Sequence, residues 1–500
     1  MFKGHPKGLY VLFFTEMWER FGFYTMVAIF VFYLGAAFGW DNQEVTNVWG
    51  IFMAAVYFTP IIGGYIADNY LGYGRTIILG AITLAIGYTL MAIPTSDVTQ
   101  LYIALGVVAI GNGLFKANIS VMVGNLYAHK DGSLKDAGFN IFYMGINIGA
   151  FYAPQAAAGI RNYFQNDLGT SLATAYNAGF GIAAIGMVIS LLIFVVFRKY
   201  YADADYQSKN KINSEKDVVL TPKQEKDRIV ALITIFTIVI FFWMAFHQNG
   251  AALSLYAQNY TDQFVGPVTA VLFNIIGLHA VIAFFIGLGL LFSTDSSTNS
   301  KLSGGALLLA GASVIAYQAM NNEPLTEISP EQFISFNAMF IVLMTPLIVF
   351  IFRWMNGRGL EPSSPAKIGI GMLVTGLAFL LMMFASFSLP PVYSLNGNPS
   401  PVTVTPYFLI STYFVLTIAE LFLSPMGLSF VSKVAPPRMK GLMMGGWFMA
   451  TAIGNYLSGF VGRFYQNWEL WEFFLLLVIC SLLSAGMVLV LLKKLKAATE

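Results

Sequence analysis

The feature that most constrains this chain is a long series of apolar stretches, each about 20 residues in length. A helix of that length crosses the roughly 30 Å of a bilayer's hydrocarbon core. Hydrophobic residues make up 57% of the chain and charged residues only 10%, far less charge than a soluble domain carries. The sequence therefore predicts an all-α, multi-pass membrane protein with fourteen spans, near residues 8–36, 46–69, 74–93, 98–127, 138–160, 171–197, 229–260, 264–292, 303–320, 328–354, 365–388, 403–434, 441–464 and 471–494.

The positions of the basic residues predict the orientation of these spans. Loops rich in Lys and Arg stay in the cytoplasm. With the N-terminus inside, 23 of the 27 Lys and Arg residues fall on the cytoplasmic side, and only Arg161 and Arg463 fall outside. We therefore expect both termini in the cytoplasm and a location in the plasma membrane, as in a bacterial inner membrane. The first span contains Glu16, Glu19 and Arg20, which a cleaved signal peptide would not, so we expect it to be permanent.

Several classes of function are not expected. A net charge of +2 indicates no basic surface, so nucleic acid is not an expected partner. The single cysteine, Cys480, lies in the last span and permits no internal disulfide or cysteine-based metal site. The polar loops show no nucleophile with a base and no metal-spaced histidines, so we expect neither an enzyme nor a cofactor or metal.

One hydrophilic segment divides the chain. Residues 198–228 contain eight Lys or Arg and six Asp or Glu, and they follow the sixth span. We therefore expect a six-helix bundle over 1–197, a charged cytoplasmic linker over 198–228, and a second bundle that begins with a helix over 229–260. Two such bundles can rock against each other around a site at the midplane of the membrane.

The loop after the second span carries glycines, an acid and a base in the order GGYIADNYLGYGR, over residues 63–75. It resembles the loop signature of the major facilitator superfamily, whose fold is a pair of six-helix bundles. Glycines let helices approach closely. The resemblance implies that Asp68, with Arg75 nearby, gates the cytoplasmic side. An ordinary tight turn is the alternative.

Five ionisable residues are the clear cases of charges well inside the membrane: Glu16, Glu19, Arg20, Lys116 and Glu420. Each costs about 2.5–3.5 kcal/mol at the bilayer centre, so each indicates a function. Three acids against two bases leave one carboxyl without a base, and we predict that it takes up a proton. Glu16, Glu19 and Arg20 share one helical face, where they would form the proton-coupling group with Lys116. The alternative is a salt-bridge cluster that only holds the helices of the bundle together.

Glu420 has no base in its own span. A substrate ammonium group would be its natural partner, as a substrate carboxylate would be for Lys116. This arrangement predicts a zwitterion held between the two bundles. The alternative is a protonated acid in the core.

Three further motifs point to one family. Residues 16–24, EMWERFGFY, resemble the ExxERFxYY signature of the proton-dependent oligopeptide transporters, a family within the major facilitator superfamily. Residues 111–120, GNGLFKANIS, resemble that family's fourth helix, and residues 142–149, FYMGINIG, are similar to its FYxxINxG signature. The resemblance extends over most of the chain.

The resemblance implies a proton-coupled symporter that imports di- and tripeptides by alternating access. Its partners would be peptides, protons and membrane lipid, and we expect a monomer. By resemblance, Glu420 would meet the peptide amine. The other positions that the resemblance assigns to peptide binding are Tyr24, Tyr57, Asn147, Asn337, Trp243 and Trp447. As alternatives, the aromatic residues would form an interfacial belt and the asparagines would join helices.

The sequence departs from the family pattern at three places. Phe23 replaces a tyrosine, and Val27 replaces an arginine implicated in binding the peptide carboxylate. His247 stands where many relatives carry a glutamate, and we hypothesise that it shares this task with Lys116. A hydrogen bond to a neighbouring helix is the alternative for His247, and another zwitterionic or anionic solute, or a peptide sensor that does not transport, is the alternative function.

The third departure is an insertion. We predict an extra two-helix hairpin over 261–327, before the remaining five helices of the second bundle at 328–500. We expect this hairpin to pack laterally or contact lipid, and we expect His279 within it to serve in packing.

Overall fold

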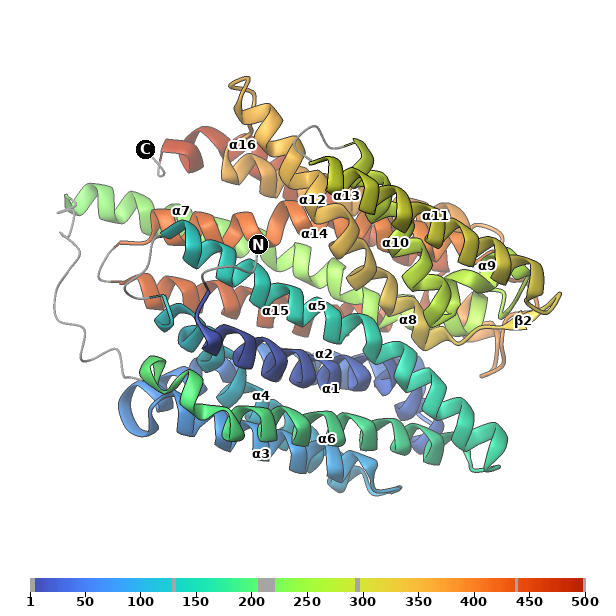
Figure 1. Cartoon of the computed structure of the whole chain (residues 1–500). Helices are drawn as coiled ribbons and strands as arrows, with labels where there is room; N and C mark the ends of the chain where they lie inside the picture. Colours follow the sequence, from blue (N-terminus) through green and yellow to red (C-terminus); the bar gives the residue numbers. More distant parts are fainter. Residues whose placement is uncertain (1–4, 128–131, 206–220, 293–296, 437–438, 498–500) are drawn as a thin grey trace.

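A computed structural model describes residues 5–127, 132–205, 221–292, 297–436 and 439–497. Nearly all of these residues are helical, as predicted (Figure 1). The long helices of the described part, each of at least 18 residues, are α1 (Lys7–Phe38), α2 (Asn42–Ile66), α3 (Tyr73–Ala92), α4 (Val98–Asn125), α5 (Gly132–Asn162), α6 (Leu172–Val196), α7 (Pro222–Phe246), α10 (Ile275–Phe292), α11 (Thr298–Asn321), α12 (Ser335–Asn356), α13 (Ser364–Ser386), α14 (Tyr407–Val434), α15 (Lys440–Asn467) and α16 (Leu470–Ala497).

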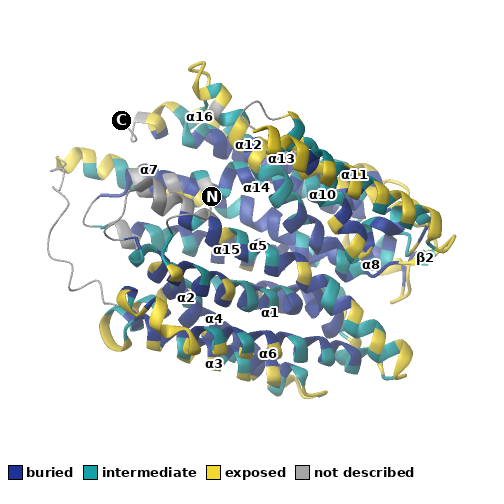
Figure 2. Ribbon diagram, viewed as in Figure 1, coloured by how far each residue is buried: buried dark blue, intermediate teal, exposed yellow. Residues whose placement is uncertain are grey.

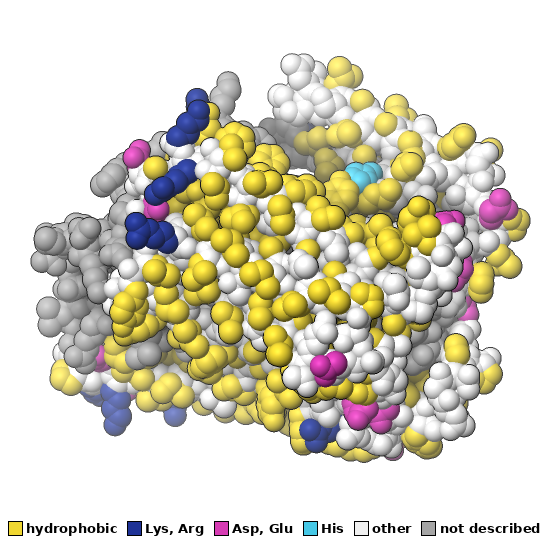
Figure 3. All heavy atoms as spheres, turned by 90° about the horizontal axis from the view of Figure 1, so that it is seen from below, with side chains coloured by type: hydrophobic (Ala, Val, Ile, Leu, Met, Phe, Trp, Pro, Cys, Tyr) yellow, Lys and Arg dark blue, Asp and Glu magenta, His cyan; other side chains and the backbone are white. Residues whose placement is uncertain are grey.

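These long helices agree with the predicted number of crossings. Within the described part, 12 segments are both long and apolar enough to cross a membrane. Helices α5 and α15 are long enough, with 31 and 28 residues, but more polar. Viewed as in Figure 3, the surface has a broad hydrophobic band with charged side chains near its two ends. A bilayer would cover such a band.

Polar residues before several helices set where those helices begin. The side chains of Asp41, Ser171 and Ser297 accept hydrogen bonds from the backbone amides three residues later, which otherwise lack a partner at a helix start. Thr221 and Gln224 form a complete capping box at the start of α7. These caps fix the first residues of α2, α6, α7 and α11.

Two predicted spans differ from the structure. The span expected over 229–260 is interrupted by a 3-10 turn, His247–Gly250, and continues as α8 (Ala252–Tyr260). The expectation of a span beginning at residue 264 is wrong. Its first part forms a strand, β1 (Phe264–Val265), the one-turn helix α9 (Pro267–Ala270) and a 3-10 turn, because β1 pairs antiparallel with β2 (Thr326–Glu327).

The helices pack in two groups and a hairpin. Helices α1–α6 contact one another around one core, and α7, α8 and α12–α16 surround another. Helices α10 and α11 pack chiefly on each other. Buried residues lie on the faces where helices meet, and exposed residues lie on the outer faces and at the ends (Figure 2). We call the α1–α6 group the first bundle and the other group the second bundle.

The two bundles meet tightly at one end. We call the end that carries Lys7 and Ala497 the linker end, and the opposite end, where α2 starts and α15 stops, the far end. In the far half, a Cβ atom added at Gly50 of α2 would lie 2.5 Å from the Gly459 Cα of α15, so only glycine fits. Closer to the far end, Nε of Arg463 on α15 donates a hydrogen bond to Oδ1 of Asn47 on α2 at 2.6 Å.

A second seam joins α5 to the start of α12. The Arg161 guanidinium forms an ion pair with Glu331, with Nε–Oε1 at 3.0 Å, and Glu331 is fully buried. Glu331 lies in the 3-10 turn Pro330–Ile334, which precedes α12. Gln332 of the same turn donates to Gln155 of α5 at 2.7 Å. The far end is therefore closed in this conformation.

Candidate functional site

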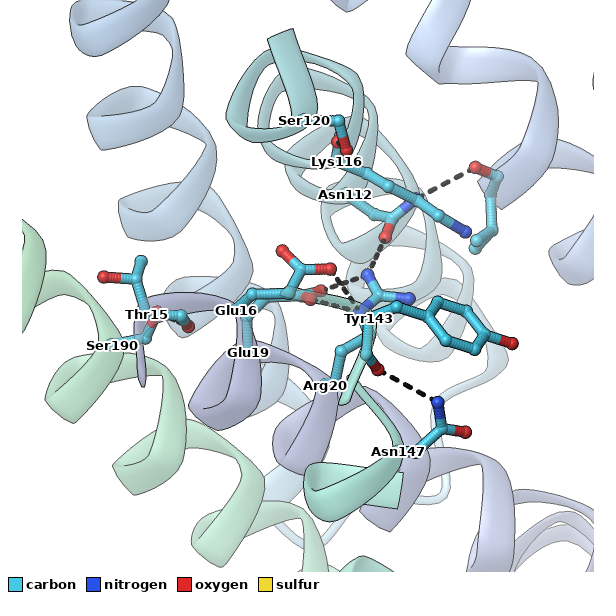
Figure 4. Close-up of polar contacts among 11 residues, drawn as sticks. Thr15, Glu16, Glu19, Arg20, Asn112, Lys116, Ser120, Tyr143, Asn147 and Ser190 are labelled. Atoms are coloured by element: carbon cyan, nitrogen blue, oxygen red, sulfur yellow. Dashed lines mark hydrogen bonds and ion pairs between the residues drawn. The ribbon is translucent and has the colours of Figure 1, made fainter. Parts of the chain in front are cut away.

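Two acids and one base of α1 form the centre of the first bundle (Figure 4). Arg20 donates two hydrogen bonds to Glu19, one of them from Nη2 to Oε1 at 2.7 Å. Its Nε also lies 3.4 Å from Oε1 of Glu16. All three side chains are at most 3% exposed. The structure thus brings both carboxyls to one guanidinium, inside the bundle.

Asn112 of α4 completes the surroundings of Arg20. Its Oδ1 accepts from Arg20 Nη2 at 3.1 Å, and its Nδ2 donates to the Val56 carbonyl oxygen at 2.9 Å. Sequence reasoning gave Asn112 no role, although it lies one helical turn before Lys116. That spacing, on a helix with a buried base, was the available signal.

Lys116 is placed differently from Arg20. Its Nζ lies 4.4 Å from the centroid of the Tyr57 ring, as in a cation–π contact. It interacts electrostatically with Glu16 and Glu19, but in the described part it forms no ion pair within 4.0 Å. Its charge is therefore balanced at longer range and remains available to an anionic group.

A row of side chains leads from Lys116 into the second bundle. The Tyr57 ring lies 5.6 Å from the His247 ring, which in turn lies 5.4 Å from Trp243. His247 is 7% exposed, and its Nε2 makes no hydrogen bond to any described residue. The 3-10 turn that interrupts α7 begins at His247. His247 therefore reaches Lys116 through Tyr57 rather than by direct contact.

The acid of the second bundle is held by a neutral amide. Glu420 of α14 accepts a hydrogen bond from Asn337 Nδ2 at 3.0 Å. The same nitrogen donates to Thr417 Oγ1 at 3.0 Å. Among the described residues, no Lys or Arg forms an ion pair with Glu420. Its negative charge therefore has no matching base nearby.

The two halves of the site face each other. Three tyrosines of the first bundle, Tyr24, Tyr57 and Tyr143, interact electrostatically with Glu420. Tyr24 packs against the cores of both bundles. Asn147 donates to the backbone oxygen of Tyr143 at 2.9 Å, one turn earlier on α5. The structure thus brings together most of the predicted site residues at the bundle interface.

The residues that replace the family's polar groups are buried. Phe23 is 2% exposed and Val27 is 7% exposed. The Arg20 guanidinium lies 4.9 Å from the centroid of the Phe23 ring. Phe23 therefore packs against the ion cluster instead of offering a hydroxyl to a ligand.

Three predicted residues lie apart from this group. Trp447 is 3% exposed and packs against α14 and α7 within the second bundle, with its ring 6.5 Å from Phe236. Asp68 accepts from the Tyr73 hydroxyl at 2.6 Å and does not pair with Arg75 in this conformation. The backbone amide of Gly74 is instead held by Asp205, at 2.8 Å.

Comparisons with known proteins find relatives that match most of this chain. A model of the POT family matches residues 74–223 and 306–471. The chain is 30% identical to the uncharacterized transporter YclF of Bacillus subtilis, over 100% of this chain and 96% of the relative. It is 31% identical to the peptide transporter YePEPT of Yersinia enterocolitica, over 92% and 88% of the two chains. It is 29% identical to a di-/tripeptide transporter of Lactococcus lactis subsp. cremoris, over 99% and 96%.

Solved structures with a similar fold are found as well. A mutant of the peptide transporter POT in complex with alafosfalin superposes with a TM-score of 0.75 and 26% identity, and the match covers 100% of this chain and 96% of that one. The same transporter in complex with sulfate superposes with a TM-score of 0.74, over the same shares of the two chains. The likeness covers the whole chain and confirms the predicted fold class.

Proposed function

Because this chain belongs to the POT family, whose relatives are transporters and not enzymes, we propose that it imports di- and tripeptides together with protons by alternating access. The single observation that supports a peptide as the substrate is the placement of opposite charges. Lys116 of the first bundle and Glu420 of the second bundle each lack an ion-pair partner in the described part and face a common interface. A small peptide carries opposite charges at its two ends.

We assign the peptide's ammonium group to Glu420 and its carboxylate to Lys116, with His247 beside it. Asn147 and the hydroxyls of Tyr24 and Tyr57 would hydrogen-bond the peptide backbone, because their helices carry them to the interface. Asn337 would hold Glu420 in position from its own bundle. Trp243 and Trp447 would form apolar walls, Trp447 from deeper in the core.

Proton coupling is assigned to the ion cluster of α1. Oε2 of Glu16 makes no hydrogen bond to any described residue, while Oε1 lies near Arg20. A proton on Glu16 or Glu19 would weaken that carboxyl's hold on Arg20 and change the charge that Lys116 experiences. Each proton that crosses 100 mV gains about 2.3 kcal/mol, which is enough to drive accumulation.

The closed far end indicates which contacts would have to open during alternating access. We propose that both termini lie in the cytoplasm of a bacterium, because Lys and Arg are concentrated in the loops of the linker end. The far end would then face outward, and loading would require the seams at Gly50 and Arg161 to open. Asp68 and Arg75 would act as a gate at the linker end in the opposite conformation. We propose that a single chain performs this cycle.

The test is uptake of labelled dialanine into liposomes that contain the purified protein. We expect accumulation with an inward acid gradient, little accumulation without one, and competition by tripeptides but not by free amino acids. Competition by free amino acids alone would indicate another zwitterionic solute. Binding without any flux would indicate a sensor, and either result would contradict the proposed function.

A further inference from the structure

The inserted hairpin, α10 and α11, lies at the edge of the molecule. Only 11% of the apolar window of α11 is buried, and only 22% of that of α10 (Figure 2). Glycines bring the two helices together, since a Cβ atom added at Gly287 would lie 2.5 Å from the Gly304 carbonyl oxygen. The hairpin contacts α12 of the second bundle through α10. Its chain connections also lead to the second bundle on both sides.

One side chain of the hairpin reaches the first bundle. Nε2 of His279 on α10 lies 2.5 Å from the hydroxyl of Tyr152 on α5. Nδ1 of His279 lies 2.6 Å from the Ile275 carbonyl oxygen, one turn earlier. A carbonyl oxygen only accepts, so Nδ1 carries the proton and Nε2 accepts from Tyr152. The expectation that His279 only packs is therefore wrong, because both of its nitrogens make directed bonds.

Ring contacts hold this bond in place. The His279 ring lies 5.4 Å from the Tyr152 ring and 5.8 Å from the Phe151 ring, which meets it edge-on. Tyr152 remains 38% exposed on the outer surface of the bundle. In a bilayer this surface would face lipid, so water would not be at hand to replace the bond if it broke.

A second connection lies nearer the far end. Gln332 donates both to Gln155 of α5, at 2.7 Å, and to the Phe273 carbonyl oxygen just before α10, at 2.8 Å. A polar cavity of about 190 Å³ lies beside these groups, with Gln155, Phe273 and Gln332 in its wall. Water in such a cavity can replace the bonds of Gln332. Tyr152 and His279 do not line this cavity.

Helix α5 is also the helix that closes the far end, through Arg161 and Glu331. When that seam opens, α5 must move relative to the second bundle and to the hairpin attached to it. We propose that the hairpin is a brace, in which the bond between His279 and Tyr152 holds α5 in the far-end-closed position and so limits how often the far end opens. This inference rests on the proposed alternating access, for which Tyr152 and His279 would be positioning residues that do not touch the peptide.

The test measures a distance at the far end in a lipid bilayer. Replacing the single cysteine by Cys480→Ala allows spin labels to be placed at Ser96→Cys and Asn398→Cys, two exposed far-end positions on opposite bundles. Gly50→Ala serves as the reference for the open distance, because its Cβ atom would lie 2.5 Å from the Gly459 Cα. No peptide and no proton gradient are present, so the result does not depend on which solute is carried.

We expect Tyr152→Phe to raise the ratio of open to closed protein about three- to tenfold, the effect of one hydrogen bond between helices in a membrane. The matched control is Tyr317→Phe on the same hairpin, which removes the hydroxyl of a residue that is 69% exposed. His279→Phe should act like Tyr152→Phe, and the double variant should go no further than either alone. Equal distances in the Tyr152 and Tyr317 variants, or additive effects of the Tyr152 and His279 variants, would overturn the proposal.

Discussion

The two halves of the site hold their charges in opposite ways. In the first bundle, Glu16, Glu19 and Arg20 are almost fully buried and bound to one another. In the second bundle, Glu420 is partly exposed and bound only through the neutral amide of Asn337. A buried charge that is already paired has little to gain from a visiting ion, whereas an unpaired one has much to gain. The difference suggests that the first bundle handles the proton and the second bundle handles the ammonium group of the substrate.

The largest expected effect comes from removing the charge of Glu19. Glu19→Gln keeps the shape of the side chain but cannot release a proton, so accumulation driven by an acid gradient should be lost. Exchange of labelled for unlabelled peptide needs no net proton movement and should persist. Uptake and exchange are measured on the same liposomes. Accumulation at the wild-type level would contradict the assignment of Glu19 to proton coupling.

The next effect concerns Glu420, which should act on binding rather than on coupling. Glu420→Gln should weaken peptide binding about 10- to 100-fold, as expected for a lost bond between charged groups. Acetylating the peptide's amine should weaken binding to the wild type by a similar factor and leave binding to the variant nearly unchanged. Binding is measured by calorimetry on the purified protein. Equal sensitivity of both proteins to acetylation would show that Glu420 does not meet the amine.

A smaller effect is expected at the amide that holds Glu420. Asn337→Leu removes a neutral hydrogen bond, so peptide affinity should fall about threefold to tenfold. Asn321→Leu is the matched control, because Asn321 is exposed and its amide donates only to the Tyr317 carbonyl oxygen of its own helix. If Asn337→Leu were as severe as Glu420→Gln, Asn337 would itself be a primary contact with the peptide.

The smallest effect is expected at His247, which lies between the two halves. His247→Gln should lower the affinity for peptides with a free carboxylate about threefold, as expected for the loss of one hydrogen-bonding group near the carboxylate. Peptide amides, which lack the carboxylate, should be unaffected. His5→Gln is the control, since His5 bonds to Tyr127 away from the site. An unchanged affinity for peptides with a free carboxylate would exclude His247 from carboxylate binding.

The fold was predictable because apolar length is a strong and simple signal. The helical class and the number of crossings follow from hydrophobic stretches of about 20 residues. The start of α10 could not be predicted in this way. Residues 264–274 are as apolar as a span, but residues 264–265 form a strand pair with residues 326–327. A pairing partner some 60 residues away leaves no trace in a local window of hydropathy.

The site was predictable in its charges but not in its neutral partners. Buried ions are rare enough that Glu16, Glu19, Arg20, Lys116 and Glu420 draw attention in any span. Asparagines and tyrosines are common there, so the contacts of Asn112 and the bond between Tyr152 and His279 required coordinates. The expected gate was not predictable in its pairing, since Asp68 accepts from Tyr73 in this conformation and does not pair with Arg75.

The most direct test of the central claim is to follow the protons that accompany peptide entry. Liposomes with a pH-sensitive dye inside, and no gradient imposed, should acidify when dialanine is added outside to the wild-type protein. Liposomes with the Glu19→Gln protein should not acidify. Peptide entry at the wild-type rate with no change in internal pH would contradict proton coupling through the buried carboxyls of α1.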